Sequence, residues 1–305
     1  MSKPLLAGIE AGGTKFVCAV GYSPVDIIKE IRFPTSAPEE TMTRAHEFFV
    51  ECEKELGPVY SLGIASFGPV DLDISSDTYG HITSTPKLQW AGTDIVGFFK
   101  QRMHVPLGFD TDTNAAALGE GRYGAGRNCD TFLYLTIGTG VGGGVVVDNK
   151  ALHGLVHPEV GHLRVVPRRD DPFPGTCPFH GSCLEGMAAG PAIEARWGKP
   201  GIELPEDHPA WDLEAWYLAQ GLAAMVLMLS PQRIIMGGGV MHQPQIFPAI
   251  RRYLKEFLNG YVDRSEITGE REDYIVFPER ENRAGITGAL LLAEDAGSVE
   301  KGVGE

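Results

Sequence analysis

Two segments of the chain share one design: a strand-like apolar run, a turn rich in glycine and threonine, and a second apolar run. The first is LLAGIEAGGTKFVCAVG at residues 5–21, and the second is TFLYLTIGTGVGGGVVVD at residues 131–148. Glycine at such positions lets two strands reverse tightly, so each segment predicts a β-hairpin. One hairpin opens each half of the chain, which is a weak internal repeat and predicts a two-lobed architecture.

The rest of the chain alternates between strand-like and helix-like patterns. Such alternation predicts an α/β fold with mixed sheets covered by helices, and 305 residues suffice for two compact lobes. We place the lobes at residues 1–118 and 119–305, with the last helix packing on the N-terminal lobe. Further strands are expected at 61–68, 105–112, 233–240 and 274–279, and helices at 42–56, 93–103, 114–124, 188–198, 211–230, 247–261 and 284–296.

The composition narrows the range of partners and compartments. The formal net charge of -14 and the pI of about 5.1 repel a phosphate backbone, which disfavours nucleic acid as a partner. No stretch approaches the roughly 20 apolar residues that a membrane span needs, and the N-terminus has no secretory pattern. Five cysteines, an odd number, argue against a disulfide framework and for a reducing compartment. We therefore expect a cytoplasmic protein without a membrane partner.

Two glycine motifs look like familiar nucleotide fingerprints, but their context differs. GIEAGGTK at residues 8–15 ends in Thr-Lys rather than Lys-Ser/Thr, and a strand follows where a P-loop needs a helix. Gly138, Gly140 and Gly143 have dinucleotide-fingerprint spacing, but a strand follows them as well, so no helix N-terminus is present to hold a pyrophosphate.

These turns suit anion binding of another kind. Glycines allow backbone N–H groups to approach an anion closely, and threonine and lysine add donors or charge. A third glycine cluster follows a strand at residues 237–239. Although hairpins need glycine in any case, three such loops after strands favour a nucleotide cleft between two lobes. The candidate nucleotide-binding residues are Gly12, Gly13, Thr14, Lys15, Thr139, Gly140, Gly142, Gly237, Gly238 and Gly239.

The segment FDTDTNAAALGE lies at an expected strand-to-helix junction. Asp110 and Asp112 are two residues apart near the end of the strand and therefore share one face. Phosphoryl transfer to a hydroxyl needs a carboxylate that accepts the proton and little other covalent chemistry. A plain helix N-cap is the alternative, because Asp and Asn are common at that position.

The segment from His153 to Cys183 is long, irregular and rich in Pro, Gly and His, which is typical of functional or metal-held loops. CPFHGSC contains Cys177, His180 and Cys183, and His162 lies upstream. Two thiolates and two imidazoles could make a closed tetrahedral Zn²⁺ site of the structural type. His153 and His157 are weaker alternative ligands, and unpaired cysteines beside loop histidines remain possible.

The order of these motifs resembles the ROK family of sugar kinases. GIEAGGTK and TIGTGVGGG are similar to the family's two phosphate loops, and RIIMGGGV is similar to its adenosine loop. The resemblance extends from residue 5 to about residue 295 and is closest to bacterial fructokinases. It implies the two-lobed actin/hexokinase-like (ribonuclease H-like) fold, with duplicated βαβ lobes around a cleft. Glu10 stands where the family usually has Asp.

The resemblance also implies an activity: transfer of a phosphoryl group from ATP, with Mg²⁺, to a hexose, with D-fructose and fructose 6-phosphate as the expected substrate and product. It makes Asp112 the general base and a structural Zn²⁺ an expected cofactor, with His180 where many members have cysteine. A homodimer is expected. The implied sugar-binding residues are Asn114, Glu159, His162, Glu185, Gly68 and Pro69, and the implied zinc ligands are His162, Cys177, His180 and Cys183.

Three alternatives stay open at this point. A glucokinase, mannokinase or N-acyl hexosamine kinase of the same family would share the pocket motifs. A sugar-responsive regulator without catalysis would carry a helix-turn-helix domain of roughly 60–80 residues before the first phosphate loop, and here that loop begins by residue 8. An NAD-dependent oxidoreductase is disfavoured by the strand after each glycine turn.

Overall fold

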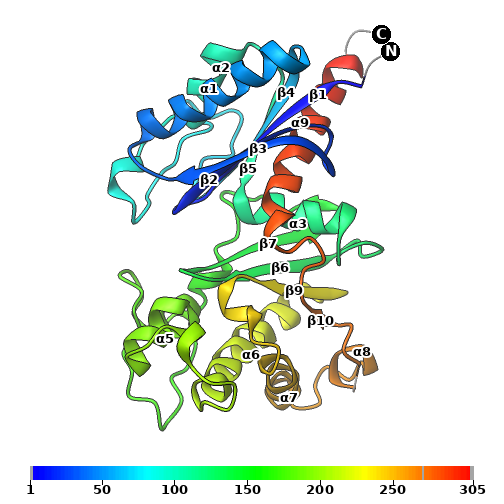
Figure 1. Cartoon of the computed structure of the whole chain (residues 1–305). Helices are drawn as coiled ribbons and strands as arrows, with labels where there is room; N and C mark the ends of the chain where they lie inside the picture. The colour runs from blue at the N-terminus through cyan, green and yellow to red at the C-terminus, as the bar shows by residue number, and fades with distance from the viewer. Residues whose placement is uncertain (1–2, 270, 303–305) are drawn as a thin grey trace. The chain divides into compact units, whose positions relative to one another are not determined.

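The computed structural model describes residues 3–269 and 271–302, and the chain divides into two compact units (Figure 1). Unit 1 contains the N-terminal chain up to Arg127, the segment Lys150–Pro158 and the C-terminal part from Arg280; unit 2 contains Asn128–Asn149 and Glu159–Glu279. The lobe boundary expected at residue 118 falls inside a helix of unit 1, and the last helix belongs to unit 1.

Unit 1 is built on a five-stranded mixed sheet of order β3-β2-β1-β4-β5. Strands β1, β2 and β3 form an antiparallel meander, and β4 and β5 continue from β1 in parallel. The sequence patterns did not predict β3, in which nearly all residues are exposed or partly exposed. The elements are β1 (Leu5–Ala11), β2 (Lys15–Ser23), β3 (Asp26–Pro34), α1 (Pro38–Leu56), β4 (Val59–Ser66), η1 (Leu88–Trp90), α2 (Ile95–Met103), β5 (Leu107–Thr111), α3 (Asp112–Tyr123), η5 (Glu281–Arg283) and α9 (Ala284–Gly302).

The two faces of this sheet carry different helices, because alternate residues of a strand point to opposite faces. On β1, Leu5, Ala7 and Ile9 belong to the core that includes Phe49 of α1 and Phe99 of α2. Leu6 instead belongs to the core that includes α9 residues. The C-terminal helix therefore completes the fold of the N-terminal sheet.

Three glycines allow α9 to lie against the sheet. Gly8, Gly63 and Gly108 are paired in register across β1, β4 and β5. A Cβ atom at Gly63 would lie 1.8 Å from the carbonyl oxygen of Ala289, and one at Gly108 would lie 2.4 Å from that of Leu292. A side chain at Gly63 or Gly108 would displace the helix backbone, and one at Gly8 would press against the side chain of Leu290.

A second five-stranded mixed sheet has the order β10-β9-β6-β7-β8, and its strands β6, β7, β9 and β10 belong to unit 2. β6 and β7 form the second hairpin, and β9 and β10 continue from β6 in parallel. Starting from the first strand of each hairpin, both sheets have the same strand order, so the predicted repeat and α/β fold class are confirmed. The strands are β6 (Phe132–Ile137), β7 (Val141–Val147), β8 (Lys150–Ala151), β9 (Arg233–Gly237) and β10 (Ile275–Val276).

The helices of unit 2 pack around the apolar helix α6 (Ala210–Leu229), most of whose side chains are buried. This helix contains the longest apolar run of the sequence, and its neighbours include α7. In the described part of the chain, no helix combines the length and apolarity needed to cross a membrane. The other helices are η2 (Val160–His162), α4 (Leu184–Ala188), α5 (Gly190–Trp197), η3 (Gly201–Glu203), η4 (Gly239–His242), α7 (Ile246–Leu258) and α8 (Ser265–Thr268).

Candidate active site

Asp112 is the first residue of α3, directly after strand β5. The N-cap of this helix is Thr111, whose hydroxyl accepts the backbone N–H of Asn114 at 3.0 Å. The carboxylate of Asp112 accepts the adjacent N–H of Thr113 at 2.8 Å. Thr111 therefore caps the helix, and helix capping does not explain why a carboxylate stands at position 112.

The environment of Asp112 favours a carboxyl group that can exchange a proton near neutral pH. The side chain is partly buried, and the loss of hydration raises its pKa from 3.8 to about 6, although hydrogen bonds to backbone N–H groups oppose the shift. A pKa just below the working pH leaves the group ionised and still basic enough to accept a proton.

Asp110 lies at the same junction, but its carboxylate is committed to other protein groups. Oδ1 accepts the N–H of Thr111 and the side-chain amide of Asn114, both at 2.7 Å. Oδ2 lies 3.0 Å from Nε2 of His153. Asp110 and Asn114 are both buried. The amide of Asn114, a predicted sugar ligand, thus orients Asp110.

The predicted sugar-wall residues Gly68 and Pro69 follow strand β4, and the peptide bond between them is cis. The next N–H, of Val70, donates to Nε2 of His157 at 3.2 Å, and a Cβ atom at Gly68 would lie 3.4 Å from the same ring. Burial lowers the pKa of His157, which keeps the ring neutral and able to accept this bond.

The first glycine turn connects β1 and β2. The N–H of Gly12 donates to the carbonyl of Lys15 at 3.0 Å, and Thr14 and Lys15 are exposed. Glu10 precedes the turn, and burial, with the charge of Asp112 as a smaller cause, raises its pKa to about 7. Its Oε2 is buried and has no hydrogen-bond partner among the described residues. A carboxylate oxygen of this kind, beside an exposed lysine, suits a cation or a water held by one.

In unit 2 the second and third glycine clusters lie together. Gly138 and Gly140 close the β6–β7 turn, and Gly190, at the start of α5, donates its N–H to the carbonyl of Gly138 at 2.7 Å. Gly238 has a φ of 92° and lies so close to Ile137 that a Cβ atom would be 2.4 Å from its carbonyl oxygen. Only glycine fits there.

The remaining nucleotide candidates divide between these loops and their strands. Thr139 is exposed at the tip of the turn, and Gly239 begins η4. Gly237 lies in β9. Gly142 lies in β7, paired with Thr136, and therefore outside the turn.

The same hairpin holds two predicted sugar segments. Oε2 of Glu185 accepts the N–H of Val141 at 3.0 Å. A Cβ atom at Gly161 would lie 1.8 Å from the carbonyl oxygen of Val141, so glycine is needed for η2 to pack there. Glu159 precedes η2 and His162 ends it. Within unit 2, Glu159, His162 and Glu185 are therefore all attached to the end of the glycine hairpin.

The four predicted zinc ligands form one cluster in unit 2. Their donor atoms, Nδ1 of each histidine and Sγ of each cysteine, all lie within 4.8 Å of one another. Nδ1 of His162 lies 3.3 Å from Nδ1 of His180, 3.7 Å from Sγ of Cys177 and 3.6 Å from Sγ of Cys183. A tetrahedral Zn²⁺ with ordinary bond lengths spaces its nitrogens about 3.3 Å apart and a nitrogen and a sulfur about 3.6 Å apart. The donor set and its spacing fit zinc.

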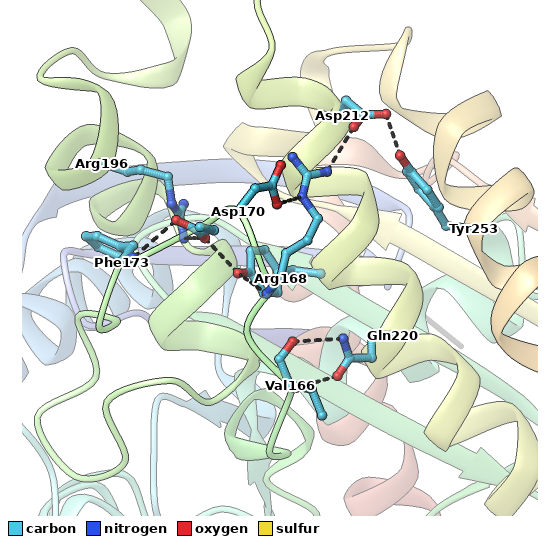
Figure 2. A network of polar contacts seen from close by, with 10 residues as sticks. Val166, Arg168, Asp170, Phe173, Arg196, Asp212, Gln220 and Tyr253 are labelled. Atoms are coloured by element: carbon cyan, nitrogen blue, oxygen red, sulfur yellow. Dashed lines mark hydrogen bonds and ion pairs between the residues drawn. The ribbon is translucent and has the colours of Figure 1, made fainter.

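The loop between His162 and Cys177 is held by a polar network (Figure 2). Asp171 accepts from the hydroxyl of Tyr217 at 2.6 Å and pairs with Arg196 at 3.3 Å, and the two ionic side chains are almost fully buried. Arg196 also donates twice to the carbonyl of Met187 in α4, at 3.1 Å. Arg168 pairs with Asp212 of α6 at 3.0 Å. This network attaches the loop to α4, α5 and α6 through protein contacts alone.

Comparison with known proteins assigns the chain to a family. Residues 6–296 match the ROK family. The chain belongs to the ROK family. A relative from Bacillus subtilis (strain 168) is 48% identical over 99% of both chains. The fructokinase of Pediococcus pentosaceus is 42% identical over 96% of this chain and 98% of its own. Among solved structures, a ROK family glucokinase from Streptomyces griseus in complex with glucose and AMPPNP has a TM-score of 0.73 at 26% identity, covering 95% of this chain and 99% of that one.

In this ROK protein, sequence reasoning missed the roles of several residues that contact the predicted site residues. Asp110 was noted only as a neighbour of Asp112, and His153 and His157 only as alternative zinc ligands. Gly190 was not singled out. The two histidines lie in HGLVHPEVGH, and their spacing beside a predicted sugar motif was the available signal. Nothing in the sequence indicates that this short segment belongs with unit 1.

Proposed function

We propose that this ROK protein transfers the γ-phosphoryl group of ATP to the 6-hydroxyl of D-fructose. Relatives named fructokinase, 42% and 43% identical over nearly the whole chain, support the substrate. The observation that carries the chemistry is Asp112 at the start of α3, a carboxylate that does not cap the helix and whose pKa is raised to about 6.

In the proposed reaction, Asp112 accepts the proton of the sugar hydroxyl as its oxygen attacks the γ-phosphorus. The bond between that phosphorus and the β–γ bridging oxygen breaks, and ADP leaves with the bond's electron pair. Asn114 and Asp110 keep the junction in place through their mutual hydrogen bond. Glu159, His162 and Glu185 are proposed to bind sugar hydroxyls, since carboxylates accept from them.

The glycine turns are proposed to bind ATP through backbone N–H groups, with Gly12–Lys15 on unit 1 and Gly138–Gly140 and Gly237–Gly239 on unit 2. Mg²⁺, when bound, would neutralise charge on the phosphates. Glu10 is the residue proposed for the Mg²⁺ side, because its buried Oε2 lacks a hydrogen-bond partner among the described residues.

We further propose that His162, Cys177, His180 and Cys183 hold one structural Zn²⁺. With all four positions occupied by protein, such an ion organises the chain and leaves no open position for a substrate. All five cysteines are free, which supports a reducing compartment, and we propose the cytoplasm.

A coupled ADP-release assay with ATP and Mg²⁺ tests the activity against fructose, glucose, mannose and N-acetylmannosamine. We expect the highest kcat/KM for fructose and a product phosphorylated at carbon 6 by NMR. A higher kcat/KM for another hexose would contradict the fructose assignment and leave the kinase assignment in place. Hexose binding without ADP release would favour a regulator. Light scattering in solution tests the predicted homodimer.

A further inference from the structure

His153 lies at the same strand-to-helix junction as Asp112, yet the proposed mechanism gives it no role. Its Nε2 is 3.0 Å from Oδ2 of Asp110 and 3.4 Å from the amide nitrogen of Asn114. The segment that carries it, Lys150–Pro158, belongs to unit 1 together with Asp112. His153 therefore forms part of the carboxylate cluster at this junction.

The three members of the cluster differ sharply in exposure. The side chain of Asp110 is 4% exposed and Asn114 is 1% exposed, whereas the side chain of His153 is 43% exposed. Both oxygens of Asp110 already bind protein groups. His153 is thus the member of the cluster that can meet a ligand, and the other two hold it.

The free face of the ring has a defined chemistry. Nε2 is occupied by Asp110, and Nδ1 has no partner among the described residues. When Nε2–H donates to Asp110, Nδ1 accepts a hydrogen bond in the neutral ring and donates one in the protonated ring. A hydroxyl group can serve as either partner, so a polyol matches this nitrogen in both protonation states.

We propose that His153 is a sugar-contacting residue, hydrogen-bonded through Nδ1 to a hydroxyl of the hexose and held by Asp110. This inference rests on the proposed function, because it takes Asp112 as the reaction centre. It also gives Asn114 a different role from the predicted one. Buried and bonded to Asp110, Asn114 acts as a positioning residue for His153 rather than as a sugar ligand.

The test compares the full-length wild type with His153→Ala and a control, His81→Ala. His81 lies in the same unit, 3.9 Å from Asp94, and is not among the proposed site residues. Calorimetry without nucleotide gives the Kd for fructose and for its 1-, 3- and 4-deoxy analogues. We expect His153→Ala to raise the Kd for fructose about 10- to 100-fold, because it removes one hydrogen bond to the sugar. The KM for ATP should stay within about twofold of the wild-type value.

The analogues make the test specific to a contact. The deoxy analogue that lacks the bonded hydroxyl should bind wild type weakly, and His153→Ala should not distinguish it from fructose, because the two changes remove the same hydrogen bond. The proposal would be overturned if His153→Ala weakened the binding of every analogue by the same factor as the binding of fructose. An unchanged Kd for fructose, or a parallel rise in the KM for ATP, would also overturn it. If wild type phosphorylates another hexose instead, that hexose and its deoxy analogues replace fructose. Wild type that phosphorylates no hexose would overturn the proposed function itself.

Discussion

At the scale of single residues, Asp112 shows how one neighbour changes an interpretation. From the sequence alone its carboxylate could be a helix cap or a base. Thr111 caps α3 instead, and the pKa of Asp112 is raised to about 6 by lost hydration. At this junction Thr111 caps the helix, and the carboxylate of Asp112 is left available for chemistry.

Asp112→Asn should lower kcat about 10²- to 10⁴-fold, because the amide cannot accept the hydroxyl proton. The Kd for sugar and the melting temperature should change little, since the helix keeps its cap. Thr111→Ala is the matched stability control and should cost about 1 kcal/mol of unfolding free energy. Steady-state kinetics and thermal melts check both variants. Near-normal turnover by Asp112→Asn would exclude Asp112 as the base.

The pH dependence of the reaction should report the same carboxyl group. Below its pKa Asp112 is protonated and cannot accept a proton, so kcat/KM for the sugar should fall about tenfold per pH unit below about 6. Glu10, with a pKa near 7, is the other shifted carboxyl group at this site. Glu10→Gln should leave the limb near pH 6 in place. A limb that disappears in that variant would assign it to Glu10.

At the scale of elements, the loop from Leu163 to Cys183 is held twice. The Arg196–Asp171 pair fixes its first part to the helices of unit 2, and the Cys/His cluster closes its second part. The sequence suggested only the metal as an organiser. A metal ion is therefore needed to order only the segment around Cys177 and His180, because protein contacts already hold the first part of the loop.

Protein purified without chelator should contain about one zinc per chain, and Cys183→Ser should lose it. Metal removal should weaken sugar binding, because Cys183 caps the helix that carries Glu185. Hydrogen exchange should then accelerate at 176–183 but not at 166–173, where the polar network remains. Cys129→Ser, outside the cluster, is the control. Full activity without metal, or equal exchange in both segments, would contradict this account.

At the scale of the whole molecule, the two sheets repeat one strand order, and the C-terminal helix completes the N-terminal sheet. The in-register glycines Gly8, Gly63 and Gly108 are what let α9 approach the sheet. The first strand, β1, and the last helix, α9, thus belong to one unit, and the segment Lys150–Pro158 belongs to it as well.

Gly63→Ala should lower the free energy of unfolding by about 1–3 kcal/mol, because its Cβ would force α9 away from the sheet. Gly239→Ala is a suitable control, since its added Cβ would have no atom within 4 Å. Denaturant titration of both variants checks the difference. Equal stabilities would show that the glycine row is not needed for the packing of α9.

Local sequence patterns were enough to predict the α/β class, the two hairpins and the Cys/His cluster. Each of these depends on short-range chemistry: strand periodicity, glycine turns, and donor atoms spaced for one metal ion. The strand β3 was not predicted, because its exposed and partly exposed residues lack the regular alternation of a half-buried strand. Patterns that depend on burial are readable only where one face is consistently buried.

The tertiary structure alone decided which distant residues meet. Asp110 and His153 are 43 positions apart, and the N–H of Val70 reaches His157 across 87. Hydrogen bonds of this kind leave no period in a sequence, because each partner belongs to a separate element whose position is set by packing. By itself, the sequence determined the classes of chemistry available. Packing determined that Asn114 is buried against Asp110 and that His153 is the exposed member of their cluster.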